Sequence, residues 1–195
     1  MSGEVVLVRH GETEWSRSGR HTGRSDLPLT EHGEAQARRI QGALAGEQFV
    51  LALTSPLVRA RRTAALAGLA GAEVDDDLAE WDYGAYEGRT TVEISAQRGR
   101  PWTVFADGVP GGETLEQVGV RVDRVLDRIR PVVGGGGSVA VVGHGHCLRV
   151  LAARWLGLPA AGGALLKLDA ASVSRLGTEH DVPVLALWNA QSTSV

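Results

Sequence analysis

Near its amino end the chain reads Val5-Val6-Leu7-Val8-Arg9-His10-Gly11-Glu12-Thr13. The apolar residues of this stretch are leucine or β-branched and are followed by a glycine turn, which is typical of a short buried strand. Strands that are apolar on both faces belong to parallel sheets covered by helices. In such sheets ligands bind beyond the carboxyl ends of the strands. Arg9 and His10 stand at that end, so one stretch predicts both a fold and a site.

Apolar runs and amphipathic helical patterns alternate along the rest of the chain. Further strands are expected at residues 49–54, 73–79, 138–142, 172–177 and 184–188, and helices at 31–45, 55–70, 91–97, 113–129 and 147–156. Strands that alternate with helices predict a parallel sheet with helices on both faces. The fold expected is a single three-layer α/β/α domain over residues 1–195, with a mostly parallel sheet and a short cap insertion near residues 81–112.

Local signals suggest where some of these elements begin and end. Residues 14–29 have no clean period and are expected to form a loop, as is most of the segment 81–112. Ser55 is expected to cap the helix that follows it, with Pro56 at the first helical position. Pro131 and the glycines after it are expected to end the helix at 113–129.

Composition narrows the class of protein. The chain has 195 residues, of which 43% are hydrophobic and 22% charged, as in ordinary globular proteins. Its one cysteine, Cys147, excludes an intramolecular disulfide. The net charge of −3 argues against a nucleic acid or an anionic membrane as partner. The sequence shows neither a signal peptide nor an apolar run that could span a membrane, so we expect a soluble, cytoplasmic protein.

The residues that follow the expected strands point to phosphate chemistry. They are Arg9, His10, Arg59, Glu80 and His144. Arginine binds tetrahedral oxyanions bidentately, and a neutral imidazole can attack phosphorus. A second imidazole, if protonated, can neutralise charge on the phosphoryl oxygens, and a carboxylic acid can protonate a leaving alkoxide. The set favours phosphoryl transfer through a phosphohistidine, with no metal or other cofactor because side chains supply the cations.

Two other kinds of function use similar residues. A metal hydrolase would need His10, His144 and Glu80 as ligands, but neighbouring arginines would repel a dication and no pair of histidines has helical spacing. A protein that binds phosphorylated ligands without turning them over is the alternative from outside the enzymes. It would be marked by the loss of His10 or Glu80, and both are present.

Five motifs carry a resemblance to a known family. They are Arg9-His10-Gly11-Glu12-Thr13, Ser55-Pro56-Leu57-Val58-Arg59-Ala60-Arg61-Arg62-Thr63-Ala64, Leu78-Ala79-Glu80-Trp81-Asp82-Tyr83-Gly84-Ala85-Tyr86-Glu87-Gly88, Gly111-Gly112-Glu113-Thr114 and Val142-Gly143-His144-Gly145. In these motifs and their order the chain resembles the histidine phosphatase superfamily, the phosphoglycerate-mutase-like proteins. The resemblance spans residues 9–145 and implies a phosphoglycerate-mutase-like fold.

The resemblance also implies roles for single residues. His10 would be the phosphorylated nucleophile, and Glu80 the general acid that later activates water. The phosphate pocket would be formed by Arg9, Arg59 and His144, and the groups that close it would be Ser16, Thr22, Gly23 and Gly145.

Other polar residues of the motifs are expected to be structural. Arg62 would pair with a carboxylate outside the pocket, and Glu87 would brace its loop. The remaining histidines would be surface or packing residues: His21, His32, His146 and His180. His21, beside Thr22, is the candidate exception.

The mutases of this family carry a long insertion between the third motif, the acid loop that contains Glu80, and the fourth motif, which begins at Gly111. In this chain only residues 89–110 lie between the two motifs. Residues 14–23 are also similar to the branch of sedoheptulose-bisphosphatase-like enzymes and acid phosphatases. We therefore expect a phosphomonoesterase for small phosphorylated metabolites such as sugar mono- or bisphosphates, with a cofactor-dependent phosphoglycerate mutase as the alternative.

The short cap and the late strands carry two further expectations. Arg89 and Arg100 could hold a second anion of a bisphosphate, and Trp102 could flank a sugar, although a solvated loop with a packed tryptophan is the simpler interpretation. Apolar residues near Val184–Trp188 could form a sheet edge that makes a homodimer.

Overall fold

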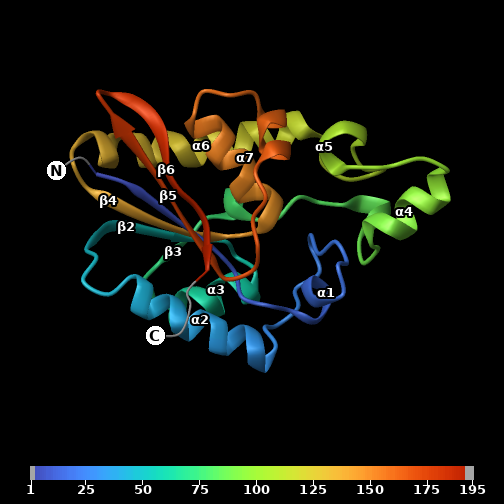
Figure 1. Ribbon diagram of the computed structural model, residues 1–195, viewed down its shortest axis with the longest axis horizontal. Coiled ribbons are helices and arrows are strands. Elements are labelled where there is room, and N and C mark those ends of the chain that lie inside the picture. Colours follow the sequence, from blue (N-terminus) through green and yellow to red (C-terminus); the bar gives the residue numbers. More distant parts are fainter. Residues whose placement is uncertain (1–2, 192–195) are drawn as a thin grey trace.

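Helices cover both faces of a six-stranded sheet in residues 3–191, the part of the chain that the computed structural model describes (Figure 1). The strands are β1 (Val5–Arg9), β2 (Phe49–Thr54), β3 (Glu73–Val74), β4 (Ser138–Gly143), β5 (Ser172–Glu179) and β6 (Val182–Gln191). They lie in the order β3-β2-β4-β1-β5-β6. The first four in this order are parallel, and β5 and β6 pair antiparallel at one edge. The expected α/β fold with a mostly parallel sheet is confirmed.

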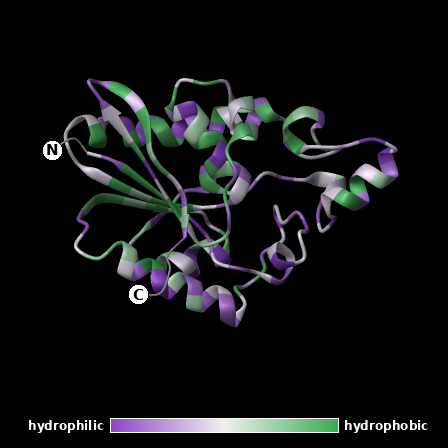
Figure 2. Cartoon of the chain, in the orientation of Figure 1, coloured by the Kyte–Doolittle hydropathy of each residue, from purple (hydrophilic) through white to green (hydrophobic). Residues whose placement is uncertain are grey.

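Two helices lie against each face of this sheet (Figure 1). Helices α2 (Glu31–Ala43) and α3 (Val58–Leu66) cover one face, and α6 (Leu115–Gly134) and α7 (Gly145–Trp155) cover the other. Side chains alternate along β1, so Val5 and Leu7 pack with α6 and α7 while Val6 and Val8 pack with α2 and α3. The central strands are accordingly among the more hydrophobic segments in Figure 2.

The register of the parallel strands brings the two motif histidines together. Arg9 pairs with Gly143 across β1 and β4, so the next residues, His10 and His144, are neighbours at the carboxyl edge. The His10 amide continues the ladder by donating to the Gly143 carbonyl at 3.0 Å. On the other side of β4, the Ser55 amide donates to the Val142 carbonyl at 3.0 Å.

A cap of short helices projects from one end of the domain (Figure 1). Its elements are the one-turn helix α1 (Glu14–Arg17), the 3₁₀ turn η2 (Gly84–Tyr86), and the helices α4 (Thr91–Arg98) and α5 (Val104–Asp107). Another 3₁₀ turn, η1 (Asp76–Leu78), follows β3 and packs against α6. A further 3₁₀ segment, η3 (Ala160–Leu165), follows α7. In the described part of the chain, no helix combines the length and the apolar character that crossing a membrane would require.

Three local expectations are wrong. Helix α3 spans Val58–Leu66, with Leu57 rather than Ser55 at the N-cap position. The Val58 amide at its start donates to Asp26 Oδ1, from a distant loop, at 2.7 Å. The loop expected after Thr13 contains α1, which a capping box between Thr13 and Ser16 stabilises. Helix α6 continues through Pro131 to Gly134, since the Pro131 carbonyl still accepts from the Gly135 amide at 3.1 Å.

Candidate active site

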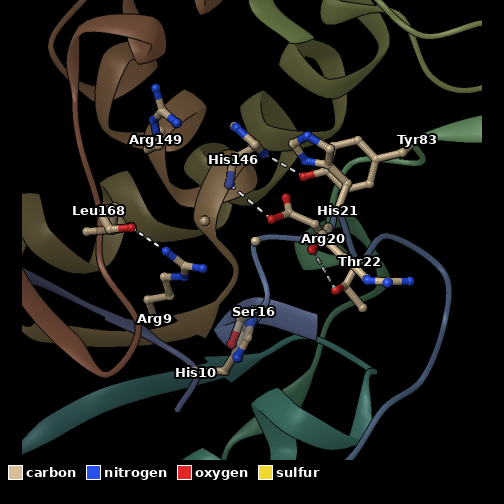
Figure 3. A pocket seen from close by; sticks show the side chains of 13 residues that line it. Arg9, His10, Ser16, Arg20, His21, Thr22, Tyr83, His146, Arg149 and Leu168 are labelled. Carbon is tan, nitrogen blue, oxygen red and sulfur yellow. Dashed lines mark hydrogen bonds between the residues drawn. The ribbon is translucent and has the colours of Figure 1, made fainter. Parts of the chain in front are cut away.

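A cavity of about 190 Å³ lies at the carboxyl edge of the sheet, between the domain and the cap (Figure 3). Residues that the sequence singled out and that line it are Arg9, His10, Ser16, Thr22, Glu80 and Gly145. Behind this wall lie Arg59, Gly23 and His144, which are buried. The structure therefore brings together the residues of all the strand ends, in two layers.

His10 is 5% exposed, and its ring is oriented by its own backbone. Nδ1 lies 2.7 Å from the Gly11 carbonyl oxygen. A carbonyl can only accept, so Nδ1 carries the proton and Nε2 keeps its lone pair. Burial lowers the pKa of His10 well below its usual value, and the charges of Arg59 and Arg9 lower it further. His10 is therefore a neutral imidazole with a nucleophilic nitrogen.

The turn that carries this acceptor is itself fixed. The Gly11 amide donates to Thr63 Oγ1 at 3.1 Å, and that hydroxyl donates to the Arg59 carbonyl at 2.8 Å. A Cβ on Gly11 would lie 2.4 Å from the Gly33 carbonyl oxygen, so only glycine fits between β1 and α2. These contacts hold the Gly11 carbonyl where it selects the His10 tautomer.

His144 is fully buried and is also neutral. Arg59 Nε donates to its Nδ1 at 3.2 Å, so its Nε2 carries the proton and donates to Ser55 Oγ at 2.7 Å. Burial lowers the pKa of His144 well below its usual value, and Arg59 adds to this effect. Its ring centroid is 5.1 Å from that of His10, at an interplanar angle of 60°. In this arrangement the positive charge beside His144 belongs to Arg59.

Arg59 fastens the loop that closes the site. Its guanidinium donates to the carbonyls of Ser25 at 2.8 Å, Thr22 at 3.0 Å and Gly23 at 3.1 Å. Burial lowers the pKa of Arg59, and the nearby Glu80 charge opposes that shift. From the other side, Glu87 accepts from the Gly23 amide at 2.9 Å, so it braces the loop as expected.

Arg9 brings an arginine to the cavity wall from the end of β1. Its Nη1 donates to the Leu168 carbonyl, and its buried Nε has no hydrogen-bond partner among the described residues. A Cβ on Gly145 would lie 3.3 Å from Arg9 Cζ, so the glycine lets this guanidinium approach the start of α7 closely. Burial lowers the pKa of Arg9, opposed by Glu80. An unpartnered buried N–H on a cation suits an anionic ligand.

Glu80 lies at the amino end of α7. Its Oε1 accepts from the amides of Trp81 and Cys147, both at 2.9 Å, and its Oε2 accepts from the His146 amide at 3.0 Å. The carboxyl group is 8% exposed, at the cavity wall. It is the one carboxylate among the lining residues and is rigidly placed.

The chain around Glu80 is clamped by an ion pair. Arg121 Nε donates to Glu113 Oε1 at 2.8 Å, and its Nη1 donates to the carbonyls of Asp77 at 2.7 Å and Ala79 at 2.6 Å. Glu113 in turn accepts from the Asp82 amide at 2.9 Å. The residues on both sides of Glu80 are thus tied to α6.

The sequence did not single out six residues of the cavity wall: Gly19, Arg20, Tyr83, His146, Arg149 and Leu168. His146 was expected to be a surface or packing residue, yet it is half-buried and its Nδ1 lies 2.5 Å from the Tyr83 hydroxyl. Burial lowers its pKa well below the usual value, and Arg149 lowers it further. His146 and Arg149 are three apart on α7, so helical periodicity after the strand end is the signal that could have identified them.

The other histidines divide as the sequence suggested. His21 lines the cavity, and its Nε2 lies 3.2 Å from Thr91 Oγ1. Burial lowers its pKa to about 4. His32 and His180 are exposed, and Arg62 pairs with Glu34 at 2.7 Å, away from the cavity.

The cap candidates are not brought into the cavity. Arg89 donates to Gln97 and lies 5.7 Å above the Tyr86 ring centroid. Arg100 pairs with Asp107 at 2.5 Å. Trp102 is 2% exposed and packs inside the cap, where its ring is 5.2 Å from that of His21. Arg89 and Arg100 are held by these local partners within the cap, and neither of them lines the cavity.

Comparison with known proteins places this site in a family. The family model described as "Histidine phosphatase superfamily (branch 1)" matches residues 5–191. An acid phosphatase of Mycobacterium tuberculosis is 41% identical over 186 residues, covering 94% of this chain and 90% of the relative. Sedoheptulose 1,7-bisphosphatase of Saccharomyces cerevisiae is 41% identical over 182 residues, covering 78% and 67%.

Mutase relatives are more distant. A probable phosphoglycerate mutase of Photorhabdus laumondii is 35% identical over 193 residues, covering 95% of this chain and 89% of the relative. Among solved structures, the product of open reading frame Rv3214 of Mycobacterium tuberculosis superposes with a TM-score of 0.93 at 37% identity, covering 99% and 100% of the two chains. The match of residues 5–191, on a fold that carries all the motifs at one edge, means that the chain belongs to the histidine phosphatase superfamily.

Proposed function

We propose that the chain hydrolyses phosphate monoesters of small metabolites through a phosphohistidine at His10. The observation that carries this proposal is the tautomer of His10, whose Nδ1 is bound to the Gly11 carbonyl and whose Nε2 is left for the cavity. A neutral, oriented imidazole beside a guanidinium is what attack on a phosphoryl group needs.

The reaction has two steps. His10 Nε2 attacks phosphorus, the bond from phosphorus to the ester oxygen breaks, and protonated Glu80 gives its proton to the leaving alkoxide. A water molecule then gives a proton to Glu80 and attacks the phosphohistidine. The phosphorus–nitrogen bond breaks, and inorganic phosphate leaves. Arg9, whose buried Nε has no hydrogen-bond partner among the described residues, stabilises the charge on the phosphoryl oxygens, with no metal ion.

Sugar mono- or bisphosphates are the proposed substrates. Two observations support this class: the name of the 41%-identical sedoheptulose bisphosphatase, and a cavity of about 190 Å³, which limits the part of a substrate that can enter. A phosphoglycerate mutase is the second candidate, because relatives with that name match 95% of the chain. A mutase would return the phosphoryl group to a second substrate hydroxyl, whereas a phosphatase passes it to water.

The test is phosphate release from p-nitrophenyl phosphate, 3-phosphoglycerate and a panel of sugar mono- and bisphosphates, in buffer that contains a chelator. Release by the wild-type chain and its loss in His10→Ala support the proposal. Loss of activity in chelator that a divalent metal restores would overturn the metal-free mechanism. Conversion of 3-phosphoglycerate to its 2-isomer without release would make the chain a mutase, and binding without either reaction a phospho-ligand-binding protein.

A cytoplasmic location and a homodimer are also proposed. The support for a dimer is that β6, at the edge of the sheet, exposes Val182, Leu185 and Leu187. Its test is the molar mass in solution of the wild-type chain and of Leu187→Lys. A wild-type monomer would refute it.

A further inference from the structure

Two residues outside the wall of the active-site cavity hold their backbone in a conformation that side chains disfavour. Four non-glycine residues of the described chain, residues 3–191, have a positive φ. His180 and Asp181 form the turn between β5 and β6, where such angles are ordinary. The other two are Ala171 at 55° and Asn189 at 57°. Strain of this kind gathers at functional sites, where the surrounding structure enforces it.

Asn189 lies in a β-bulge on β6. In β5, Ser174 stands opposite two residues of β6, Trp188 and Asn189, because the register of the two strands shifts there. The Asn189 amide donates to Ser174 Oγ at 2.9 Å. From this bulge the Asn189 side chain reaches the loop 167–171, which precedes β5.

The Asn189 side chain holds Asp169 of that loop by two hydrogen bonds. Its Oδ1 accepts from the Asp169 amide at 2.7 Å, and its Nδ2 donates to Asp169 Oδ2 at 2.9 Å. The Trp188 indole adds a third bond from β6, to the Lys167 carbonyl. Both polar ends of the Asn189 side chain are therefore used on one residue, which fixes the position of the loop.

The loop fastened in this way has two contacts with the carboxyl end of β1. The Leu168 carbonyl accepts from Arg9 Nη1 (Figure 3). The Ala171 amide donates to the His10 carbonyl at 3.0 Å. The residue that Asn189 holds lies between Leu168 and Ala171 in the sequence, so the bulge on β6 determines where both contacts are made.

We propose that Asn189 is a positioning residue, which sets the Arg9 guanidinium and the His10 main chain through the loop 167–171. Asn189 itself does not line the cavity. The inference rests on the proposed function, since it assumes that Arg9 holds the phosphoryl group that His10 attacks. Phosphoryl transfer depends on placement, and a misplacement of about 1 Å can cost about 100-fold in rate.

The competing role for Asn189 is structural. Its bonds join β6 to the loop, and that alone would stabilise the fold. The two roles differ in what the loss of the bonds changes. A residue that only stabilises the fold lowers the free energy of unfolding and leaves kcat/KM of the folded chain unchanged, whereas a positioning residue lowers kcat/KM as well.

The test exchanges the two partners of the bond. Asn189→Asp loses the Nδ2 donor and sets a carboxylate against that of Asp169, while aspartate tolerates a positive φ as asparagine does. The loop should loosen, and kcat/KM should fall by about 10- to 100-fold. The double variant Asn189→Asp with Asp169→Asn returns one amide and one carboxylate to the pair, so it should recover most of the loss.

Two features of the loss identify its cause. Arg9 and His10 act on the phosphoryl group of every substrate, so kcat/KM should fall by the same factor for alkyl phosphates and for p-nitrophenyl phosphate. The effect of Glu80 differs, because it depends on the leaving group. Vanadate, an analogue of the phosphoryl group in the transition state, should also bind more weakly to Asn189→Asp in buffer without chelator.

The matched control is Arg175→Met, on β5. Arg175 pairs with Glu4 and Glu47, and the three side chains are 23%, 27% and 28% exposed. Glu4 precedes β1, so this pair lies at the end of the strand opposite His10. Arg175→Met should lower the midpoint of urea unfolding and keep the wild-type kcat/KM.

A second variant guards against misfolding. Asn189→Gly removes both side-chain bonds, and glycine adopts a positive φ without strain. It should show the same loss of kcat/KM as Asn189→Asp and takes the place of that variant if Asn189→Asp does not fold. All rates are measured at a temperature where urea titration shows each variant to be folded.

Four results would overturn the inference. They are a folded Asn189→Asp or Asn189→Gly with wild-type kcat/KM, a loss that depends on the leaving group, a double variant as slow as Asn189→Asp, and an equal loss in Arg175→Met. If the wild-type chain releases no phosphate, the proposed function fails. The inference is then judged by calorimetric binding of vanadate, and equal affinities of the wild-type chain and Asn189→Asp would refute it.

Discussion

Replacement of Arg121 by methionine removes one partner of the buried ion pair that clamps Glu80. The side chains of Arg121 and Glu113 are only 9% and 18% exposed, and the arginine also donates to the Asp77 and Ala79 carbonyls. Loss of one partner leaves a desolvated carboxylate, which costs about 3–5 kcal/mol. For a chain of this size that lowers the unfolding midpoint by roughly 6–20 °C. The variant should still fold, since domains have stabilities of about 5–15 kcal/mol.

The matched control for this prediction is Arg124→Met. Arg124 is one helical turn further along α6 and pairs with Asp77 at 2.6 Å, but its side chain is 58% exposed. Exposed pairs contribute about 0–1 kcal/mol, so this variant should unfold close to the wild-type chain. Urea unfolding followed by tryptophan fluorescence measures both.

Arg121→Met should also affect catalysis through Glu80. Because the Ala79 carbonyl loses its donor, the acid loop loosens, and kcat for alkyl phosphates should fall more than kcat for aryl phosphates. Arg124→Met should leave both unchanged. The reasoning is refuted if the free energies of unfolding of the two variants lie within about 1 kcal/mol of each other. It is also refuted if Arg121→Met lowers kcat for alkyl and for aryl phosphates by the same factor.

Three further predictions follow from the site. Glu80→Gln should slow alkyl phosphates far more than p-nitrophenyl phosphate, because good leaving groups need little protonation; equal losses would make Glu80 a structural residue. The pKa of His21 is about 4 in the fold against about 6.5 when unfolded, so the unfolded chain binds the proton first as the pH falls. Stability should therefore decrease between about pH 6.5 and 4, by up to about 1.4 kcal/mol per pH unit from this residue, and His21→Asn should flatten that slope in urea titrations. Ser55→Ala leaves the His144 Nε2–H without its 2.7 Å acceptor and should cost about 1–3 kcal/mol in the free energy of unfolding, whereas an unchanged midpoint would contradict the assigned tautomer.

Much of the fold followed from β1 and β4, because short apolar runs rich in β-branched residues and followed by glycine turns are typical of buried strands. The adjacency of His10 and His144 then followed from the parallel register, in which Arg9 faces Gly143. These features depend on local pattern and on rules for parallel sheets, so the sequence is enough to predict them.

The features that the sequence did not predict depend on distant partners. Ser55 was expected to cap a helix, yet its hydroxyl accepts from His144, and the amide at the start of α3 donates to Asp26. Arg100 was a candidate anion ligand and Arg149 was not, but Arg149 lines the cavity and Arg100 is held by Asp107. Only the tertiary structure decides which arginine keeps its charge free.

The central claim is that His10 Nε2 becomes phosphorylated, and its most direct test is to trap the intermediate. The wild-type chain is mixed rapidly with a good aryl phosphate in chelator, quenched in base, where phosphohistidine survives, and digested for mass spectrometry. The account predicts one added phosphoryl group on the peptide that contains His10. It should form as fast as the aryl alcohol is released in the first turnover, and it should be absent in His10→Ala. Turnover with no phosphopeptide, or a phosphoryl group on another residue, would contradict it.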